Sequence, residues 1–151
     1  MAAKPVLLLA LLVCASSLGC SRPLLLLPGG ALEGTTAEAP DDWSFTDAVD
    51  TVQLETRPSD PYSVNIWVIA QGESLYVHAG TSRSTWVEHI EADPNVRVQV
   101  NDAIYELSAA RVESQQEFDR FSDAYERKYE RRPRNENASE AYLFRLRARE
   151  G

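Results

Sequence analysis

The residues best suited to chemistry lie in a polar segment at residues 80–85, which we call the elbow. Three of its hydroxyl groups come from Thr81, Ser82 and Ser84, and Arg83 supplies a guanidinium. A short apolar pattern typical of a helix follows. The free N–H groups and the dipole at a helix N-terminus favour anions, so the elbow predicts a phosphate-binding site. The alternative is that the hydroxyl groups only cap the helix, because the Thr-Trp-Val-Glu string that begins at its last residue fits a capping box.

Few other side chains could act as an acid, a base or a metal ligand. The two histidines, His78 and His89, show no metal-ligand spacing. Both cysteines, Cys14 and Cys20, lie in the first twenty residues, so the folded part has no disulfide and no thiolate metal site. His78 is the one titratable candidate for catalysis, and a strand histidine satisfied within the fold is the alternative. We therefore leave the catalytic residues unknown and expect no metal.

Strands and short turns must position the elbow. Alternation of apolar and polar residues predicts six strands, at residues 51–57, 62–68, 75–79, 96–100, 103–112 and 142–149. Gly72 is expected to take positive φ in the turn between the second and third strands. One helix follows the elbow and is ended by Pro94, and a second begins with a capping box at Ser114.

The second helix carries an aromatic stripe that we expect to pack in the core. Its members recur at helical spacing: Phe118, Phe121, Tyr125 and Tyr129. Short strands separated by regular turns favour a closed or partly closed antiparallel barrel. The predicted fold is thus mainly β with two helices, a six-stranded antiparallel split β-barrel.

Charge excludes one class of function. The chain of 151 residues has 15 basic and 23 acidic residues, a net charge of −8, which argues against general nucleic-acid binding. Basic residues crowd the C-terminal quarter: Arg127, Lys128, Arg131, Arg132, Arg134, Arg145, Arg147 and Arg149. They are interleaved with glutamates, so a solvated, salt-paired face is favoured over a polyanion site.

The N-terminus predicts export from the cell. Residues 1–19 combine Lys4 with an apolar run too short to span a bilayer, which is typical of a signal peptide. Cys20 follows this run as in a bacterial lipobox, although Ser17 stands where such boxes usually carry leucine. Lipidation of Cys20 would anchor the protein in a membrane of the cell envelope. Cleavage by the ordinary signal peptidase or an uncleaved anchor are the alternatives.

A tether is expected to separate the anchor from the domain. Residues 20–40 are rich in proline and glycine, which argues against regular structure. The four leucines at 24–27 either lie on the bilayer or pack on the domain. The split-barrel domain is expected to occupy residues 41–151.

The order of these elements resembles the flavin-binding split-barrel superfamily, which includes pyridoxamine-phosphate-oxidase-like and deazaflavin-dependent nitroreductase-like proteins. The resemblance rests on VNIWVIAQGESLYVHAG, TSRSTWVEHIEADPNVRVQV, AIYELSAARV, AYERKYERRP and YLFRLR, and it covers residues 52–149. In that superfamily a Ser-Arg-Lys string after the third strand holds the cofactor phosphate. The matching positions here are Ser82, Arg83 and Ser84, so the lysine is missing.

The resemblance implies further site residues and a cofactor. Asn65 and Trp67 correspond to residues that flank the isoalloxazine ring, and His78 and Thr81 would lie at the mouth of the pocket. FMN or a deazaflavin is the implied cofactor, and a homodimer is the implied assembly.

Two functions of different classes follow from the sequence. The first is a flavin or deazaflavin oxidoreductase in which the cofactor carries the hydride chemistry. The second is a cofactor-free envelope lipoprotein that binds a small ligand or a protein, which the missing lysine and the export signal favour. A structural envelope protein held at the membrane through Cys20 is a third alternative.

Overall fold

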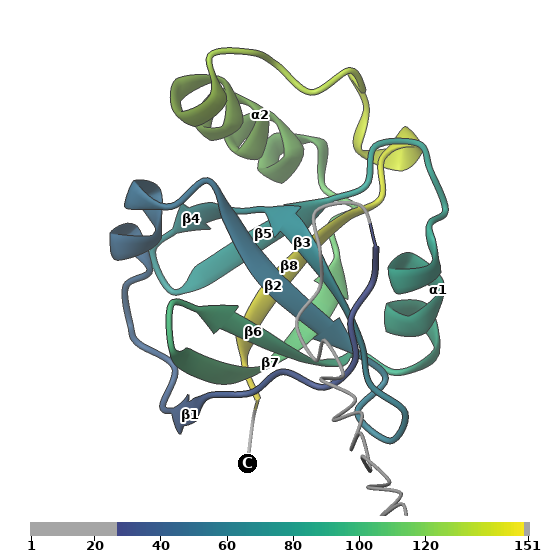
Figure 1. The fold of residues 1–151 in the computed structure, drawn as a ribbon. Coiled ribbons are helices and arrows are strands. Elements are labelled where there is room, and N and C mark those ends of the chain that lie inside the picture. Colours follow the sequence, from purple (N-terminus) through teal and green to yellow (C-terminus); the bar gives the residue numbers. More distant parts are fainter. Residues whose placement is uncertain (1–26, 150–151) are drawn as a thin grey trace, which may run out of the picture.

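A computed structural model describes residues 27–149, which form one curled, mainly antiparallel sheet with two α-helices. The strands are β1 (Thr35–Ala37), β2 (Thr51–Thr56), β3 (Tyr62–Trp67), β4 (Ile69–Gln71), β5 (Ser74–His78), β6 (Asn95–Val100), β7 (Ala103–Arg111) and β8 (Leu143–Ala148). The helices are α1 (Thr85–Ala92) and α2 (Gln115–Tyr129), with 3₁₀ helices η1 (Ser44–Ala48) and η2 (Ala138–Glu140). In Figure 1, α2 lies across one end of the curled sheet and α1 lies along its side. The predicted fold class is confirmed, mainly β with two α-helices.

The strand count differs from the expected six, because the described residues form eight strands in one sheet. Seven of them follow the order β3-β2-β6-β7-β8-β5-β4, and β1 pairs in parallel with β7. The two additional strands, β1 and β4, have only three residues each. Three residues are too few to show a period of two, and the sequence of β1, Thr-Thr-Ala, has no apolar face.

The sheet is split at Val68, a buried residue between two consecutive strands. β3 pairs with β2 at one edge of the sheet, and β4 pairs with β5 at the other edge. The chain therefore crosses from one edge to the other at this single residue. The expected strand at 62–68 ends here, because neither neighbouring strand continues across the split.

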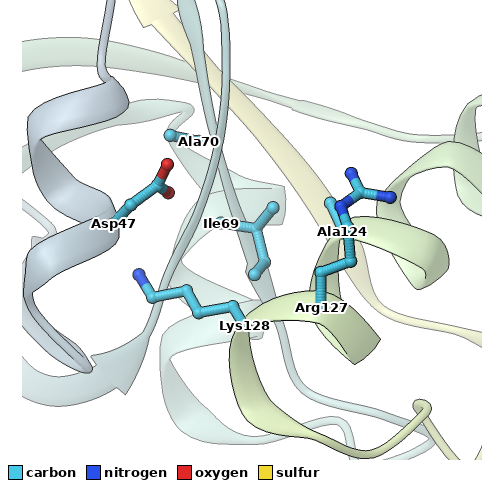
Figure 2. Close-up of a pocket in the computed structure, with 6 residues that line it drawn as sticks. All are labelled: Asp47, Ile69, Ala70, Ala124, Arg127 and Lys128. Atoms are coloured by element: carbon cyan, nitrogen blue, oxygen red, sulfur yellow. The ribbon is translucent and has the colours of Figure 1, made fainter.

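Two side chains at the end of α2 satisfy the backbone at this crossing. The Val68 N–H donates to the hydroxyl of Tyr129 at 3.0 Å, and its carbonyl accepts from Lys128 Nζ at 2.9 Å. Lys128 Nζ also donates to the carbonyl of Thr46 at 2.9 Å. Figure 2 shows the Lys128 side chain reaching from α2 toward the helix that carries Asp47. The end of α2 is thereby fixed to the split in the sheet.

The core confirms the inward faces predicted from the sequence. Buried residues of the strands include Val52, Leu54 and Val98, and α1 buries Trp86, Val87 and Ile90 against them. The aromatic stripe of α2 forms part of a second apolar cluster, in which Phe118 and Phe121 are buried and Tyr125 and Tyr129 are half-buried. The turn before β5 also forms as predicted, with Gly72 at φ 56°.

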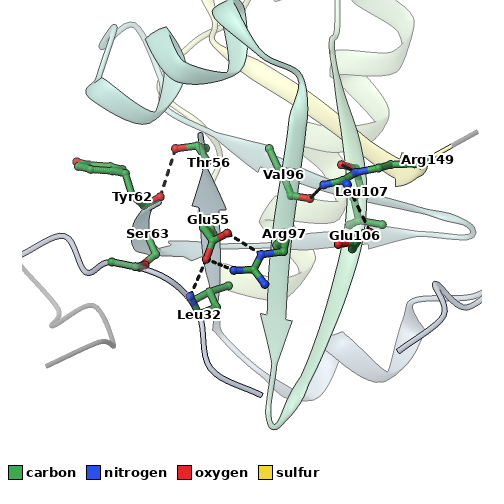
Figure 3. Close-up of polar contacts among 11 residues, drawn as sticks. Leu32, Glu55, Thr56, Tyr62, Ser63, Val96, Arg97, Glu106, Leu107 and Arg149 are labelled. Atoms are coloured by element: carbon green, nitrogen blue, oxygen red, sulfur yellow. Dashed lines mark hydrogen bonds and ion pairs between the residues drawn. The ribbon is translucent and has the colours of Figure 1, made fainter. Parts of the chain in front are cut away.

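A buried ion pair holds the segment before β1 against the sheet (Figure 3). Glu55 is 1% exposed and pairs with Arg97 through two hydrogen bonds of 2.6 Å. The same carboxylate accepts the backbone N–H of Leu32 at 2.6 Å. Gly34 packs so closely that a Cβ there would lie 2.7 Å from the carbonyl oxygen of Asp102.

Part of the expected tether therefore contacts the domain. Leu32 is buried, and Gly29 forms a bridge with Ser63. The composition of the segment does not indicate these contacts, because the residues that it meets, Glu55 and Ser63, lie far along the chain. The signal peptide, Cys20 and Leu24–Leu26 lie outside the described residues, and Leu27 is 62% exposed.

Candidate functional site

The elbow forms a turn and then a helix start, but its side chains do not cap that helix. Gly80 has φ 65°, and α1 begins at Thr85 with Ser84 as the N-cap residue. The N–H groups of Val87 and Glu88 bond to the Ser84 carbonyl at 2.9 and 3.2 Å. The hydroxyl of Ser84 is buried without a hydrogen-bond partner in the described chain. The capping box predicted at residues 85–88 is therefore wrong, because the N-cap is one residue earlier.

Arg83 is engaged by a carboxylate of the helix that follows it. Its Nε and Nη2 atoms lie 3.0 and 2.7 Å from Oε2 of Glu91, and its side chain is 58% exposed. Glu91 also lies 3.8 Å from Arg111. An anion bound at the elbow would have to compete with Glu91 for the guanidinium. Thr81 and Ser82, like Arg83, are exposed, and neither they nor Ser84 line any of the cavities described below.

The other three expected site residues lie together on a cavity beneath α2. Asn65 and Trp67 on β3 and His78 on β5 line a space of about 180 Å³. The remaining lining residues are mostly aromatic or aliphatic: Ile66, Ile69, Tyr76, Phe121 and Tyr125. We call this the aromatic cavity. The structure thus divides the seven expected residues into two groups, three at the cavity and four at the elbow.

Trp67 is held in place by aromatic and cationic neighbours. Its ring stacks on Tyr129 with centroids 4.5 Å apart and an interplanar angle of 17°. Tyr125 lies 5.8 Å from it at an angle of 45°. The guanidinium carbon of Arg131 sits 4.2 Å from the Trp67 centroid, within the range of a cation–π contact. Tyr129 and Arg131 cover the two faces of the indole, so a planar ring in the cavity would meet the edge of Trp67.

His78 contributes a neutral imidazole to the cavity. Burial lowers its pKa to about 4, although a hydrogen bond to the Asn135 side chain acts in the opposite direction. Its Nε2 atom is buried and has no hydrogen-bond partner among residues 27–149. A buried polar atom without a partner is uncommon in native proteins, and a ligand that bonds to it would remove the desolvation cost. Neutral His78 can therefore offer a ligand one hydrogen bond but no positive charge.

Two tyrosines of the cavity are also neutral at physiological pH. Burial and a hydrogen bond to Glu117 raise the pKa of Tyr76 to about 12. Burial raises the pKa of Tyr125, while the charge of Arg131 acts in the opposite direction. With these tyrosines and His78 neutral, none of the residues that line the aromatic cavity carries a charge at pH 7. Such walls suit an uncharged aromatic group.

A second cavity, of about 270 Å³, adjoins the first, because His78 and Tyr125 line both. Three of its other lining residues are arginines from the loop after α2: Arg131, Arg132 and Arg134. The sequence alone does not indicate a site at this loop, because its interleaved glutamates favour a salt-paired face. The residues that line the cavity with this loop include His78 on β5, which lies far from the loop in the sequence, so no local pattern connects the two.

The salt-paired face is confirmed for part of the basic cluster only. Ion pairs to carboxylates are formed by four of its members: Arg132, Arg145, Arg147 and Arg149. Arg131 and Arg134 form no ion pair with a described carboxylate, although both lie in the same stretch.

A third cavity, of about 380 Å³, lies between η1, β4 and α2 (Figure 2). Its charged lining residues are Asp47, Arg127 and Lys128. Lys128 already donates to two carbonyls, and burial lowers its pKa. This cavity has no aromatic wall, so it offers less to a planar ligand than the aromatic cavity does.

Among residues 27–149, no group of three or more His, Cys, Asp and Glu side chains is arranged to hold a metal ion. Within the same residues, no helix has both the length and the apolar character needed to cross a bilayer.

Comparison with solved structures shows the split-barrel fold. One match is a proposed 5-nitroimidazole antibiotic resistance protein from Bacteroides thetaiotaomicron, with 13% identity and a TM-score of 0.56 over 71% of this chain and 77% of that one. Another is a proposed pyridoxamine 5'-phosphate oxidase from Listeria innocua, with 14% identity and a TM-score of 0.54 over 68% of this chain and 86% of that one. At these identities the likeness concerns the fold.

Sequence comparisons place the chain in a family. No curated protein matches it significantly. A family described as "Uncharacterized protein conserved in bacteria (DUF2255)" matches residues 45–143, a range that begins in η1 and ends at the start of β8. This range contains most of the sheet, both α-helices and all three cavities, and it makes up well over half of the chain. The resemblance to flavin-related split-barrel proteins is confirmed at the level of the fold, and the chain belongs to the DUF2255 family.

Proposed function

We propose that this protein binds a planar aromatic cofactor of the flavin or deazaflavin class in the aromatic cavity and serves as an oxidoreductase through it. The observation that carries the proposal is the uncharged cavity that brings together Asn65, Trp67 and His78, with the Nε2 atom of His78 buried and unpartnered. The split-barrel fold shared with a proposed pyridoxamine 5'-phosphate oxidase supports it.

The residues of the cavity fit the ring of such a cofactor. Trp67, whose two faces are covered by Tyr129 and Arg131, offers its indole edge for an edge-to-face contact. His78 can form a hydrogen bond to a polar atom at the ring edge, and Phe121 packs 5.4 Å from the imidazole and limits its movement. The cofactor, when bound, would supply the hydride chemistry. The protein would bind and orient the ring and exclude water from it.

The elbow fits a cofactor phosphate less well than the sequence suggests. Arg83 is paired with Glu91, and the lysine that would assist it is missing. This observation favours the second candidate function, a protein that binds a small ligand or a partner without any redox cofactor. The two functions differ in one respect that is easily measured, which is whether flavin binds at all.

The test is a titration of the purified full-length chain with FMN and with a deazaflavin, followed by the change in cofactor fluorescence. The first function predicts saturable binding that weakens about fivefold in Trp67→Ala, because an edge-to-face contact with an aromatic side chain contributes on the order of 1 kcal/mol beyond buried area. Phe45→Ala is a matched control, since Phe45 is an exposed aromatic residue outside the three cavities. Absence of binding of either cofactor would favour the second function.

Export and membrane attachment are proposals from the sequence. We infer that residues 1–19 direct export and that Cys20 is lipidated, which would hold the domain at a membrane of the cell envelope. A homodimer is also proposed, from the superfamily resemblance.

A further inference from the structure

The loop that follows α2 lines the cavity that adjoins the aromatic cavity. The helix ends at Tyr129, and Glu130 takes φ 56°, a left-handed conformation that turns the chain away from the helix axis. Asn135 is 8% exposed, and its amide donates to the carbonyl of Glu140 at 3.3 Å. The side chain of Gln115 on α2 donates to the carbonyl of Glu136 at 3.0 Å and accepts the N–H of Ala138 at 2.9 Å. The loop is therefore fixed against α2.

The cavity that this loop lines contains guanidinium groups but no carboxylate. Arg132 is neutralised from outside the lining by Asp123 and Glu126, the latter at 2.7 Å. The guanidinium of Arg131 lies over the ring of Trp67. Arg134 is exposed and forms no hydrogen bond or ion pair with any residue in 27–149.

Two of the three guanidinium groups are thus not balanced by a described carboxylate. Acidic side chains outnumber basic ones in this chain, which has a net charge of −8, yet none of them pairs with these two guanidinium groups among the described residues. The charges are placed next to the uncharged aromatic cavity, which shares His78 and Tyr125 with the basic one. A single ligand could therefore reach both cavities.

We propose that Arg131 and Arg134 form the subsite for the phosphate of an aromatic phosphate monoester whose ring lies in the aromatic cavity. The inference deepens the proposed function, because it assigns the anionic end of the ligand to the loop after α2 and away from the elbow. Arginine suits this role, since its planar fork can donate two hydrogen bonds to one phosphate. Arg83 at the elbow is already paired, whereas Arg134 has no competing carboxylate to displace.

The magnitude of the effect follows from the strength of charge-assisted hydrogen bonds. A bond of this kind to a phosphate changes affinity by about tenfold or somewhat more. Because Arg134 is exposed, we expect the lower end of that range. The effect should appear only in ligands that carry the phosphate.

The experiment pairs each phosphate with its phosphate-free counterpart, by calorimetric titration of the full-length chain in detergent micelles. The probes are FMN against riboflavin, and phenyl phosphate against phenol. The wild type should prefer each phosphate about tenfold. Arg134→Gln should reduce this preference several-fold, and the double variant Arg131→Gln/Arg134→Gln should abolish it. Arg134→Lys should retain part of it.

Two arginine variants serve as matched controls. Arg120→Gln removes an exposed, unpaired arginine of α2 that lines neither cavity, and Arg83→Gln removes the guanidinium of the elbow. Neither should change the preference. The single variants alter exposed side chains, and their unfolding curves should match that of the wild type. The double variant also loses the contact of Arg131 with Trp67, and its binding of riboflavin and phenol reports any effect of that loss on the ring.

The possible outcomes separate the two proposals. Binding of both flavins with no preference for FMN, or a preference that depends on Arg83 and not on Arg134, would overturn the subsite and leave the proposed function standing. Binding of phenyl phosphate that depends on Arg134, with no flavin binding, would support the subsite and contradict the proposed function. No preference for either phosphate would overturn the subsite.

Discussion

The hydroxyl of Tyr129 accepts the backbone N–H of Val68 at 3.0 Å, at the residue where the chain passes from one edge of the sheet to the other. The same hydroxyl lies 2.7 Å from the carbonyl oxygen of Asp50 and 2.9 Å from that of Val68. The hydroxyl thus accepts one backbone N–H and can donate its single proton to one of the two carbonyls. Since Tyr129 also stacks on Trp67, the split in the sheet is coupled to the wall of the aromatic cavity.

Tyr129→Phe should therefore destabilise the fold while preserving the stacking. It leaves the buried N–H of Val68 without an acceptor, which costs about 1–3 kcal/mol. Denaturant unfolding monitored by circular dichroism measures the loss. Tyr125→Phe is the matched control, because the Tyr125 hydroxyl bonds to an exposed arginine and to no buried backbone group. Equal stability of the two variants would contradict the role assigned to the Tyr129 hydroxyl.

The buried ion pair between Glu55 and Arg97 gives a second prediction about stability. Glu55→Gln should lower the free energy of unfolding by about 3 kcal/mol, the lower end expected for breaking a buried pair, because Arg97 is 24% exposed. The segment that contains Leu32 should also lose protection from hydrogen exchange, since its N–H bonds to the same carboxylate. Glu106→Gln, which breaks an exposed pair of 3.4 Å with Arg149, should change stability by less than about 1 kcal/mol. An unchanged exchange rate at Leu32 would show that this bond does not hold the segment.

The pKa of His78 gives a prediction about pH. The folded state lowers this pKa from 6.5 to about 4, so the unfolded state binds more protons between these values. Stability contributed by neutral His78 is therefore complete above about pH 6.5 and is lost as the pH falls toward 4, by at most about 3 kcal/mol. His78→Gln should remove this loss of stability at low pH, whereas His89→Gln should leave most of the loss in place. An NMR titration that gives His78 a pKa near 6.5 would contradict the account.

Membrane attachment through Cys20 can be tested apart from the domain. Cys20→Ser should move the protein from the membrane fraction to the aqueous fraction of a bacterial host, because a diacylated cysteine is a stable anchor. Cys14→Ser is the control, since that residue lies within the expected signal peptide. Persistent membrane association of Cys20→Ser would favour the uncleaved anchor.

Much of the fold could be predicted from local patterns. The alternation in β2, β3 and β5 and the Ser114 cap, which accepts the N–H of Glu117 at 3.4 Å, depend on neighbouring residues, and the sequence shows them directly. β1 and β4 could not be predicted, because each is a three-residue strand defined by its partner.

The residues expected at the site lie in two places in the structure. Asn65, Trp67 and His78 line one cavity, and their roles in binding stay predictions. The pairing of Arg83 with Glu91 spans one helix and could have been considered from the sequence. The approach of Arg131 to Trp67 joins the loop after α2 to β3, and no local pattern indicates it.

The most direct test of the central claim is a measurement of where a flavin ring binds. Intermolecular nuclear Overhauser effects between the ring methyl protons of FMN and the protein's aromatic protons report contacts within a few ångströms. The account predicts such effects to Trp67, His78 and Tyr125, and their loss in Trp67→Ala. Effects confined to residues near the elbow, or to none of these side chains, would contradict it.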